Sequence, residues 1–207
     1  MRRLIFLLVF MFFFISGVFA QTNNFEGKIV LKVKTGQSEN AMNYLIKGNS
    51  VRMEMPQMPM GYMLMKDSSV YVVMPQQKMY MTIDAKQKNM MGSDPLQNLN
   101  DSQKPVATGK TKKINGYNCK EYIIDNEDGK TIIWATDEFI NFPGFAGDSD
   151  DNIKKALGMD RFFPMVVIAN EKGVQVQMEV ESIKEESISN DKFALPKDFK
   201  EMKMPGQ

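Results

Sequence analysis

Apolar and polar side chains alternate along several short segments of this chain, and such alternation is typical of β-strands with one buried and one wetter face. Within residues 51–55, for example, Arg52 and Glu54 fall between three apolar residues. Polar turns separate this segment from three others of the same kind, so we expect consecutive antiparallel strands. Every second residue of each segment points to the same side, and in the four segments many of these residues are methionines. They predict one continuous face of the sheet: Val51, Met53, Met55, Met63, Met65, Val70, Val72, Met74, Met79, Met81 and Ile83.

The same period of two predicts strands on both sides of this region. They lie at 25–34, 42–46, 106–113, 117–125, 130–136 and 164–170, with a long strand from residue 174. Short strands at close spacing, with few helical windows, predict a mainly β fold in which an antiparallel sheet curls or partly closes. A polar excursion at 85–105 is expected to be mobile. An acidic cluster at 148–151 predicts a short helix, and the 139–157 region is expected to lie across one opening of the sheet as a lid.

The first twenty residues have the pattern of a secretory signal peptide. Two arginines precede an apolar run at 4–15 that is too short to span a membrane, and small residues ending at Ala20 suit a cleavage site. We therefore expect cleavage near Ala20 and a periplasmic or secreted product with a single domain, 21–207. No cysteine follows the apolar run, as a lipid-anchored protein would need, so we expect no stable membrane anchor.

The charge balance indicates neither a nucleic-acid partner nor an acidic membrane. The chain has 26 basic and 25 acidic residues, and loss of the two leader arginines leaves 24 against 25. Bulk attraction to phosphates needs a basic excess, so we expect no nucleic-acid partner. The 187 residues that follow position 20 can bury roughly 70% of the surface of the unfolded chain, which is enough for one hydrophobic core.

Few side chains are available for catalysis. The chain has no histidine and one cysteine, Cys119. This excludes Ser-His-Asp and Cys-His catalysis, imidazole zinc sites and an intramolecular disulfide. An enzyme would have to use acidic pairs such as Glu179 with Glu181 or Asp150 with Asp151, and both pairs are more typical of solvated faces. We expect a protein that is not an enzyme and that holds no cofactor.

The predicted methionine-rich face has three interpretations. Methionine is unbranched and flexible, so the face can be core alone, or it can be a deformable wall for acyl chains of variable shape. Thioethers also select Cu(I), and a copper site is predicted from Met55, Met58, Met60 and Met63 if the loop at 56–61 folds back. For an apolar ligand, the predicted cavity wall consists of Val51, Met53, Met55, Met63, Met65, Met79, Met81 and the sole tryptophan, Trp134.

Five short motifs occur in an order that resembles a known family. They are Phe25-x-Gly27-x-Ile29, Lys47-Gly48-Asn49-x-Val51-Arg52-Met53-Glu54, Ile114-Asn115-Gly116-Tyr117-x-Cys119-Lys120, Trp134-Ala135-Thr136 and Phe193-x-Leu195-Pro196-x-x-Phe199. With the predicted signal peptide, they resemble a bacterial envelope family that is a domain of unknown function and is similar in strand order to the outer-membrane lipoprotein carriers, the LolA-like proteins. The resemblance covers residues 25–199. It implies an antiparallel half-barrel with a helical lid over a hydrophobic cavity, and a periplasmic role near the outer membrane.

The pattern and the resemblance together favour a periplasmic protein that binds a lipid or acyl chain at the inner face of its sheet. An envelope protein that meets an exposed edge strand or the 85–105 excursion is the alternative partner. Lipoprotein carriers of this kind use an arginine that reaches from the sheet to the lid. Arg52 is the candidate by position, but its parity is opposite to that of Val51 and Met53. We therefore expect Arg52 to face solvent and do not assign it that role.

Overall fold

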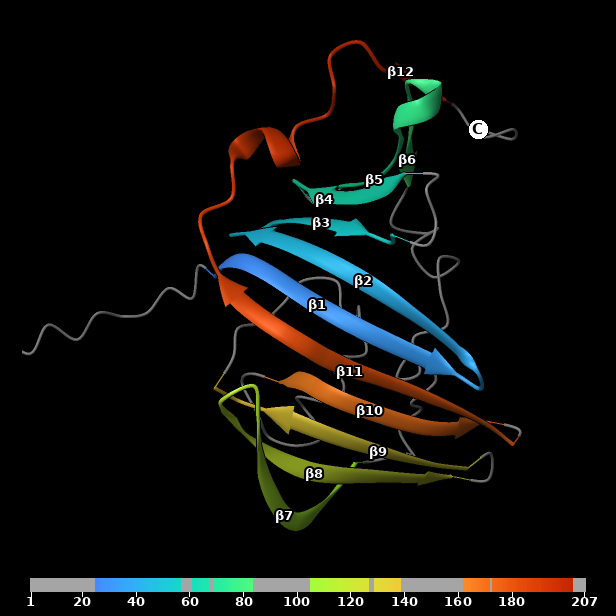
Figure 1. The fold of residues 1–207 in the computed structure, drawn as a ribbon, viewed down its shortest axis with the longest axis vertical. Coiled ribbons are helices and arrows are strands. Elements are labelled where there is room, and N and C mark those ends of the chain that lie inside the picture. Colours follow the sequence, from blue (N-terminus) through green and yellow to red (C-terminus); the bar gives the residue numbers. More distant parts are fainter. Residues whose placement is uncertain are drawn as a thin grey trace, which may run out of the picture.

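A computed structural model describes residues 25–56, 61–67, 69–83, 105–126, 129–138, 162–171 and 173–202 of the 207-residue chain. Its twelve strands form one sheet in the order β12-β6-β5-β4-β3-β2-β1-β11-β10-β9-β8-β7 (Figure 1). The strands are β1 (Glu26–Thr35), β2 (Ser38–Lys47), β3 (Ser50–Glu54), β4 (Tyr62–Lys66), β5 (Ser69–Met74), β6 (Met79–Ile83), β7 (Val106–Ile114), β8 (Tyr117–Asn126), β9 (Gly129–Thr136), β10 (Phe163–Glu171), β11 (Val174–Glu185) and β12 (Lys200–Glu201).

Two meanders make up this sheet. Strands β1 to β6 follow one another in chain order from the centre to one side, and β11 to β7 lie in reverse chain order on the other side. Neighbours within each meander are antiparallel, and so is the pair β1 and β11 that joins the meanders. β12 differs, because it adds to the outer edge of β6 in parallel orientation.

The hairpin between β7 and β8 illustrates how turn residues set the register. Asn115 and Gly116 both have a positive φ, +49° and +86°. A two-residue turn of this kind twists in the same sense as the strands that it joins. The Asn115 side chain also donates a hydrogen bond to the carbonyl of Val180 at 2.7 Å. The turn therefore both closes its own hairpin and attaches it to β11.

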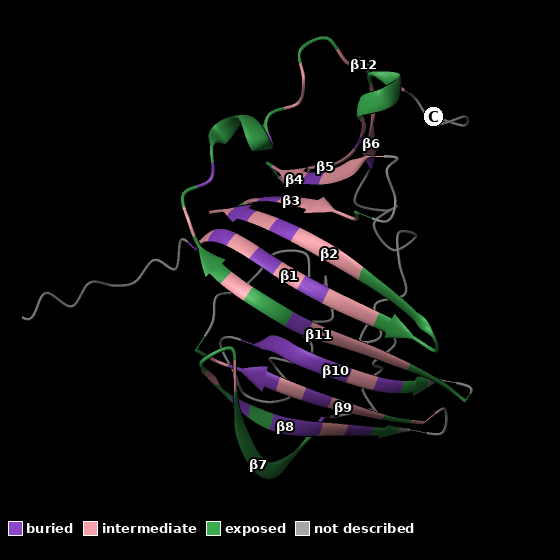
Figure 2. Ribbon diagram, viewed as in Figure 1, coloured by how far each residue is buried: buried purple, intermediate pink, exposed green. Residues whose placement is uncertain are grey.

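The apolar core follows the alternation along the strands, as the buried bands in Figure 2 show. A first cluster is centred on β1 to β3 and reaches residues of β8, β10 and β11: Phe25, Ile29, Leu31, Tyr44, Ile46, Val51, Cys119, Phe163, Met165 and Val180. A second cluster lies on and beside β8 to β10: Tyr122, Ile124, Ile133, Ala135, Phe162 and Val167. Burial of each large apolar side chain contributes about 1.5–3 kcal/mol, so a slip of register that exposed these residues would be costly.

The last described residues, 186–202, cross one face of the sheet, and we call them the C-terminal strap. The strap contains the short 3₁₀ helix η3 (Asn190–Phe193) and ends in β12. Its Ile188 and Phe193 are buried with Leu64 of β4, and the cluster is completed by Leu45, Tyr62, Tyr71 and Leu195. The sheet residues of this third cluster have the parity opposite to that of Val51 and Met65. The strap and the methionines therefore lie on opposite faces.

Polar contacts fix both ends of the C-terminal strap. At its start, Oε1 of Glu26 accepts a hydrogen bond from the backbone N–H of Ile188 at 2.6 Å and lies 3.0 Å from Nζ of Lys47. The same Lys47 ammonium donates to the Ile188 carbonyl at 2.8 Å. At the other end, the backbone N–H of Lys200 donates to the carbonyl of Lys78 at 3.0 Å. The strap is thus held by hydrogen bonds as well as by apolar burial.

The mainly β fold agrees with the sequence prediction, but the expected shape of the sheet does not. The sheet is open and twisted, and its described strands do not curl into the half-barrel that the resemblance implied (Figure 1). Closure would require the two outermost strands to pair at a consistent tilt and stagger, whereas here β12 and β7 end the sheet on opposite sides. The prediction of a curled half-barrel was therefore wrong, whereas the antiparallel, mainly β sheet was predicted correctly.

The predicted helical lid at 139–157 lies outside the described residues, and so does the predicted excursion at 85–105 except for Pro105. Within the described ranges, the helical segments are the 3₁₀ turns η1 (Pro75–Gln77) and η3. No helix in the described part of the chain is long and apolar enough to cross a membrane.

Candidate functional site

The cross-strand register brings the predicted methionine-rich residues onto one face. One row of directly paired residues crosses four strands, namely Met53, Met63, Val72 and Met81. A second row runs beside it through Val51, Met65, Val70 and Ile83. Tyr44 and Ile46 of β2 extend the two rows by one strand. Met55 follows the end of β3 and is not in the paired rows. The other predicted residues share one face, which we call the methionine face: Val51, Met53, Met63, Met65, Val70, Val72, Met74, Met79, Met81 and Ile83.

Burial separates the methionines of this face from its branched residues. Val51, Val70 and Ile83 expose only 0, 4 and 5% of their surface. Every methionine of the face is half-buried, as is Val72. Elsewhere in the described part of the chain, Met165 on β10 is fully buried. Methionine on this face therefore occupies positions whose side chains reach the surface, which a role as core filler alone does not require.

The described residues of the methionine face carry no charge. The charged side chains of β3 and β4, which are Arg52, Glu54 and Lys66, all have the opposite parity. Burial raises the pKa of Tyr44, at the start of the first row, to about 12, so its phenol stays neutral at physiological pH. An apolar ligand can thus lie on this face without desolvating a charged group.

Trp134 lies outside the paired rows of the methionine face, but it packs against the same core cluster as Met53 and Met65. Ile133, the residue before Trp134 on β9, belongs to a row of paired residues. This row leads through Val167 to Val33 of β1, and Val33 lies on the same side of the sheet as the methionine face. Trp134 has the opposite parity in this row, and the register of β9 and β10 shifts directly beside it, between Pro164 and Val166. Its ring packs against the first core cluster, and Nζ of Lys112 lies 4.1 Å from the ring centroid. The structure does not bring Trp134 into the paired rows that hold the predicted methionines.

Arg52 lies on the face that the C-terminal strap covers. Its guanidinium lies 3.5 Å from the centroid of the Tyr62 ring. Its Nε donates to Glu54 at 2.8 Å, and a terminal nitrogen donates to the strap carbonyl of Lys192 at 3.3 Å. The side chain is only 17% exposed. Parity assigned Arg52 to the correct face, but the expectation that it faces solvent was wrong, because the strap packs over that face.

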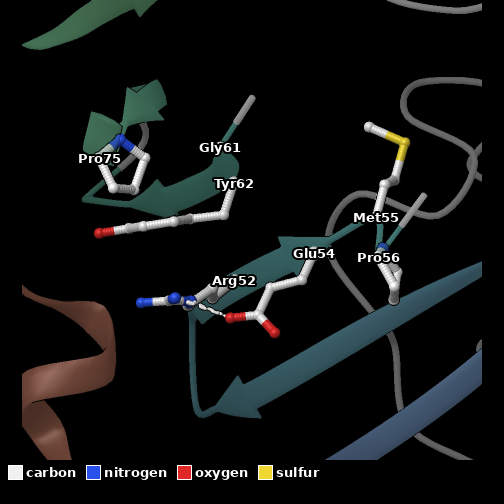
Figure 3. Close-up of a pocket in the computed structure, with 7 residues that line it drawn as sticks. All are labelled: Arg52, Glu54, Met55, Pro56, Gly61, Tyr62 and Pro75. Atoms are coloured by element: carbon white, nitrogen blue, oxygen red, sulfur yellow. Dashed lines mark hydrogen bonds and ion pairs between the residues drawn. The ribbon is translucent and has the colours of Figure 1, made fainter. Parts of the chain in front are cut away.

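A pocket of about 310 Å³ adjoins Arg52 (Figure 3). Tyr62 and Pro75 lie at one end of it and Met55 and Pro56 at the other. Burial raises the pKa of the Tyr62 phenol. Glu54 lies 2.7 Å from the Arg52 guanidinium and neutralises its charge. The pocket therefore does not offer the uncompensated positive charge that an anion site would need.

The predicted copper ligands do not form a group that can be traced in the structure. Met58 and Met60 lie outside the described residues, while Met55 follows β3 and lines the pocket. Met63 belongs to the methionine face. In the described ranges, no group of three His, Cys, Asp or Glu residues is placed to hold a metal ion. Burial also raises the pKa of the Cys119 thiol, which disfavours the thiolate that binds metals.

Of the two acidic pairs, Glu179 with Glu181 lies within the described residues. Glu181 lies on an exposed surface and forms an ion pair with Lys32 at 2.6 Å. Glu179 accepts a hydrogen bond from Gln177 at 3.3 Å. Asp150 and Asp151 lie outside the described residues.

Sequence reasoning missed the contacts that hold the strap. Glu26 and Lys47 looked like ordinary polar positions of two strands, and the strap itself has no period of two or of 3.6. The signal that could have found it is the pair of apolar residues Phe193 and Leu195 within a polar stretch. Isolated apolar residues of this kind indicate a segment that docks onto a folded surface.

The folded core corresponds to one sequence family. The family described as Domain of unknown function (DUF4412) matches residues 25–199. The chain belongs to this family. The DUF4412 match begins just before β1 and ends just before β12, so it includes both meanders and most of the strap. Among curated proteins, none is significantly similar in sequence to this DUF4412 chain.

Several solved structures match the DUF4412 chain at low sequence identity. PNGF-II matches with a TM-score of 0.48 and 14% identity, over 84% of this chain and 30% of PNGF-II. MucB matches with a TM-score of 0.48 and 7% identity, over 87% of this chain and 61% of MucB. LprF from Mycobacterium bovis matches with a TM-score of 0.34 and 9% identity, over 84% of this chain and 90% of LprF. This chain thus spans less than two thirds of PNGF-II and of MucB.

Proposed function

We propose that this protein is a non-catalytic envelope protein that binds a lipid or acyl chain against its methionine face. The observation that carries the proposal is the row of half-buried side chains Met53, Met63, Val72 and Met81, which crosses four strands without a charged residue. Half-buried apolar positions in an unbroken row offer an area that a ligand can remove from water. The predicted signal peptide supports a place in the envelope.

The length and flexibility of the row suit a linear apolar ligand. Neighbouring strands lie about 4.8 Å apart, so a row that runs from Tyr44 on β2 to Met81 on β6 spans about 19 Å. That distance accommodates much of an extended fatty acyl chain. Methionine side chains repack easily because they are unbranched and polarisable. A face of this kind can adapt to tails that differ in length or unsaturation, which a face of valine and isoleucine would do less well.

A pair of charges placed on the row tests this proposal. Met53→Lys combined with Met81→Lys puts two ammonium groups under the ligand. We expect retention of a fluorescent long-chain fatty acid to fall at least about tenfold, equivalent to ~1.4 kcal/mol of binding free energy. The measurement is a fluorescence titration of purified protein, residues 21–207, with the melting temperature recorded for each variant.

The matched control adds the same two charges to the other face. Asn43→Lys and Thr82→Lys are half-buried positions on β2 and β6, and each new ammonium lies near a carboxylate, Glu54 or Glu201. Its affinity should stay within about twofold of the unmodified protein, a difference of ~0.4 kcal/mol. Equal retention by both variants, or no uptake by the unmodified protein, would overturn the proposal.

A further inference from the structure

Three methionines of the methionine face occupy neighbouring positions on two paired strands, and these positions form a triangle. Met53 of β3 is directly opposite Met63 of β4, and Met65 follows Met63 at the same parity. Directly opposite residues have Cβ atoms about 4.5–5.5 Å apart, and residues two apart along a strand are separated by about 6.6 Å. Methionine has three rotatable bonds, so the three sulfur atoms can turn toward one point above the sheet.

Met65 packs against the first core cluster and still keeps a partly exposed surface. Its paired neighbours, Val51 and Val70, are exposed by 0 and 4%, whereas Met65 between them remains half-buried. Met53 and Met63 are half-buried as well. All three side chains thus combine contact with the apolar sheet with partial access from solvent. A ligand for the sulfur atoms could arrive without opening the core.

We propose that Met53, Met63 and Met65 form a three-sulfur binding site for Cu(I). Thioethers are soft, neutral ligands that select Cu(I) over Zn²⁺, Mg²⁺ or Ca²⁺. The triangle lies on an apolar face, since the charged residues of β3 and β4 have the opposite parity. A singly charged, weakly hydrated ion is the metal that such a setting tolerates best.

This site differs from the acyl-chain proposal in what it requires of the side chains. An acyl chain needs apolar area, which leucine supplies as well as methionine does, whereas Cu(I) needs sulfur. Substitution of methionine by leucine is close to volume-conserving. The two proposals can therefore fail independently in a single set of variants.

The test is an anaerobic titration of residues 21–207 with Cu(I) against the chromogenic competitor bicinchoninate. We expect one Cu(I) per chain, and an X-ray absorption spectrum with sulfur as the nearest neighbour. The Met53→Leu, Met63→Leu, Met65→Leu variant should bind at least about tenfold more weakly. The control variant replaces three half-buried methionines on other elements, Met42→Leu, Met178→Leu and Met202→Leu, and should bind like the unmodified protein.

The pH dependence provides a second readout. Thioethers carry no proton, so the affinity should be nearly constant from about pH 5 to pH 8, whereas thiolate or imidazole ligands must lose a proton to bind. The proposal is overturned if the triple-leucine variant keeps its affinity, or if binding rises with pH and disappears in Cys119→Ser. Retention of the fluorescent fatty acid by the triple-leucine variant would separate this site from the acyl-chain function.

Discussion

On one face of β4, Leu64 is fully buried in a cluster with Phe193 and Ile188 of the C-terminal strap. On the other face, its chain neighbours Met63 and Met65 remain half-buried. The three residues are similar in size and hydrophobicity. Among the described residues, the C-terminal strap packs over Leu64 and lies on the face opposite to Met63 and Met65. Sequence alternation distinguishes the faces of a strand, but it does not tell which apolar face is packed by the chain's own residues. Burial has to be seen in the structure.

The strap face and the methionine face also differ in how their contacts are fixed. The strap is held by a buried aromatic ring, by the stacked Arg52 and by the Glu26 and Lys47 contacts to Ile188. The methionine face has flexible side chains and no charge in its described positions. We infer that the strap face contributes mainly to stability and that the half-buried methionines of the methionine face can be replaced by residues of similar volume at little cost in stability.

The largest effect is expected at the aromatic anchor of the strap. Phe193→Ala removes a side chain that is 4% exposed, and such changes cost about 3 kcal/mol of unfolding free energy or more. Urea denaturation followed by tryptophan fluorescence measures the loss. The exposed strap residue Lys197 provides the control, since Lys197→Ala should change stability by less than ~0.5 kcal/mol. A cost below ~1 kcal/mol for Phe193→Ala would show that the strap adds little to the fold.

A smaller loss is expected at Arg52. Arg52→Ala removes the stacking on Tyr62 and the hydrogen bonds to Glu54 and Lys192, and contacts of this kind contribute about 1–2 kcal/mol when partly buried. Arg52→Lys keeps the charge but loses the planar guanidinium. The stability of this variant should therefore lie between that of Arg52→Ala and that of the unmodified protein. Denaturation midpoints at two salt concentrations would separate charge from stacking. Equal stability of the lysine variant and the unmodified protein would contradict a role for stacking.

A volume-conserving change on the methionine face should cost little, whereas a truncation on the strap face should cost more. Met63→Leu is expected to change the unfolding free energy by less than about 1.5 kcal/mol, because the swap conserves volume. Leu64→Ala, at the next residue of the same strand, should cost about 2–5 kcal/mol, because it leaves a cavity under the strap. Thermal and urea unfolding of the two single variants compare the faces directly. A large loss for Met63→Leu would mean that the methionine face is packed as tightly as the strap face.

The smallest effect on stability is expected at Glu26, and it should be visible in how the melting temperature depends on pH. The backbone N–H of Ile188 and the Lys47 ammonium hold the pKa of Glu26 below its ordinary value of 4.5. A carboxyl group with a lowered pKa stabilises the folded state above that ordinary value, and the contribution is lost as the pH falls through the folded pKa. The Tm difference between the unmodified protein and Glu26→Gln should therefore be constant from neutral pH to about pH 5 and shrink below pH 4.5. A difference that grows on acidification would contradict the assignment.

The strands and the shared parity of the methionines could be predicted from the sequence because both follow from local alternation. In residues 51–55 and 62–66, the alternation of apolar and polar residues determines which side chains share a face. Polar turns determine where each strand ends. The pairing of β1 with β11, which joins the two meanders, could not be predicted in this way. The alternation within a strand does not indicate which other strand it pairs with. The place of Trp134 could not be predicted from alternation either, because it lies outside the paired methionine rows and yet packs against the same core cluster as Met53 and Met65.

The curl of the sheet and the environment of Arg52 depend on features with no local signal. The expected curl came from the close spacing of short strands and the half-barrel from a resemblance, whereas curvature arises from bulges and strand tilt that single-strand patterns do not encode. The register shifts at Val30 with Leu31 and at Pro164 with Val166 are not marked by any sequence period. Arg52 is covered by residues about 140 positions away, and only the folded chain brings them together.

The seam between the two meanders also has a consequence for how the chain folds. Glu26 at the start of β1 and Ser187 just after β11 are in contact although 161 residues separate them. A contact of such high sequence separation forms late, and chains that depend on it fold slowly. Until β11 has formed, each meander exposes a hydrogen-bonding edge at the future centre of the sheet, where it can pair with another chain. A chaperone or a low local concentration would therefore matter most to chains that still lack their C-terminal strands.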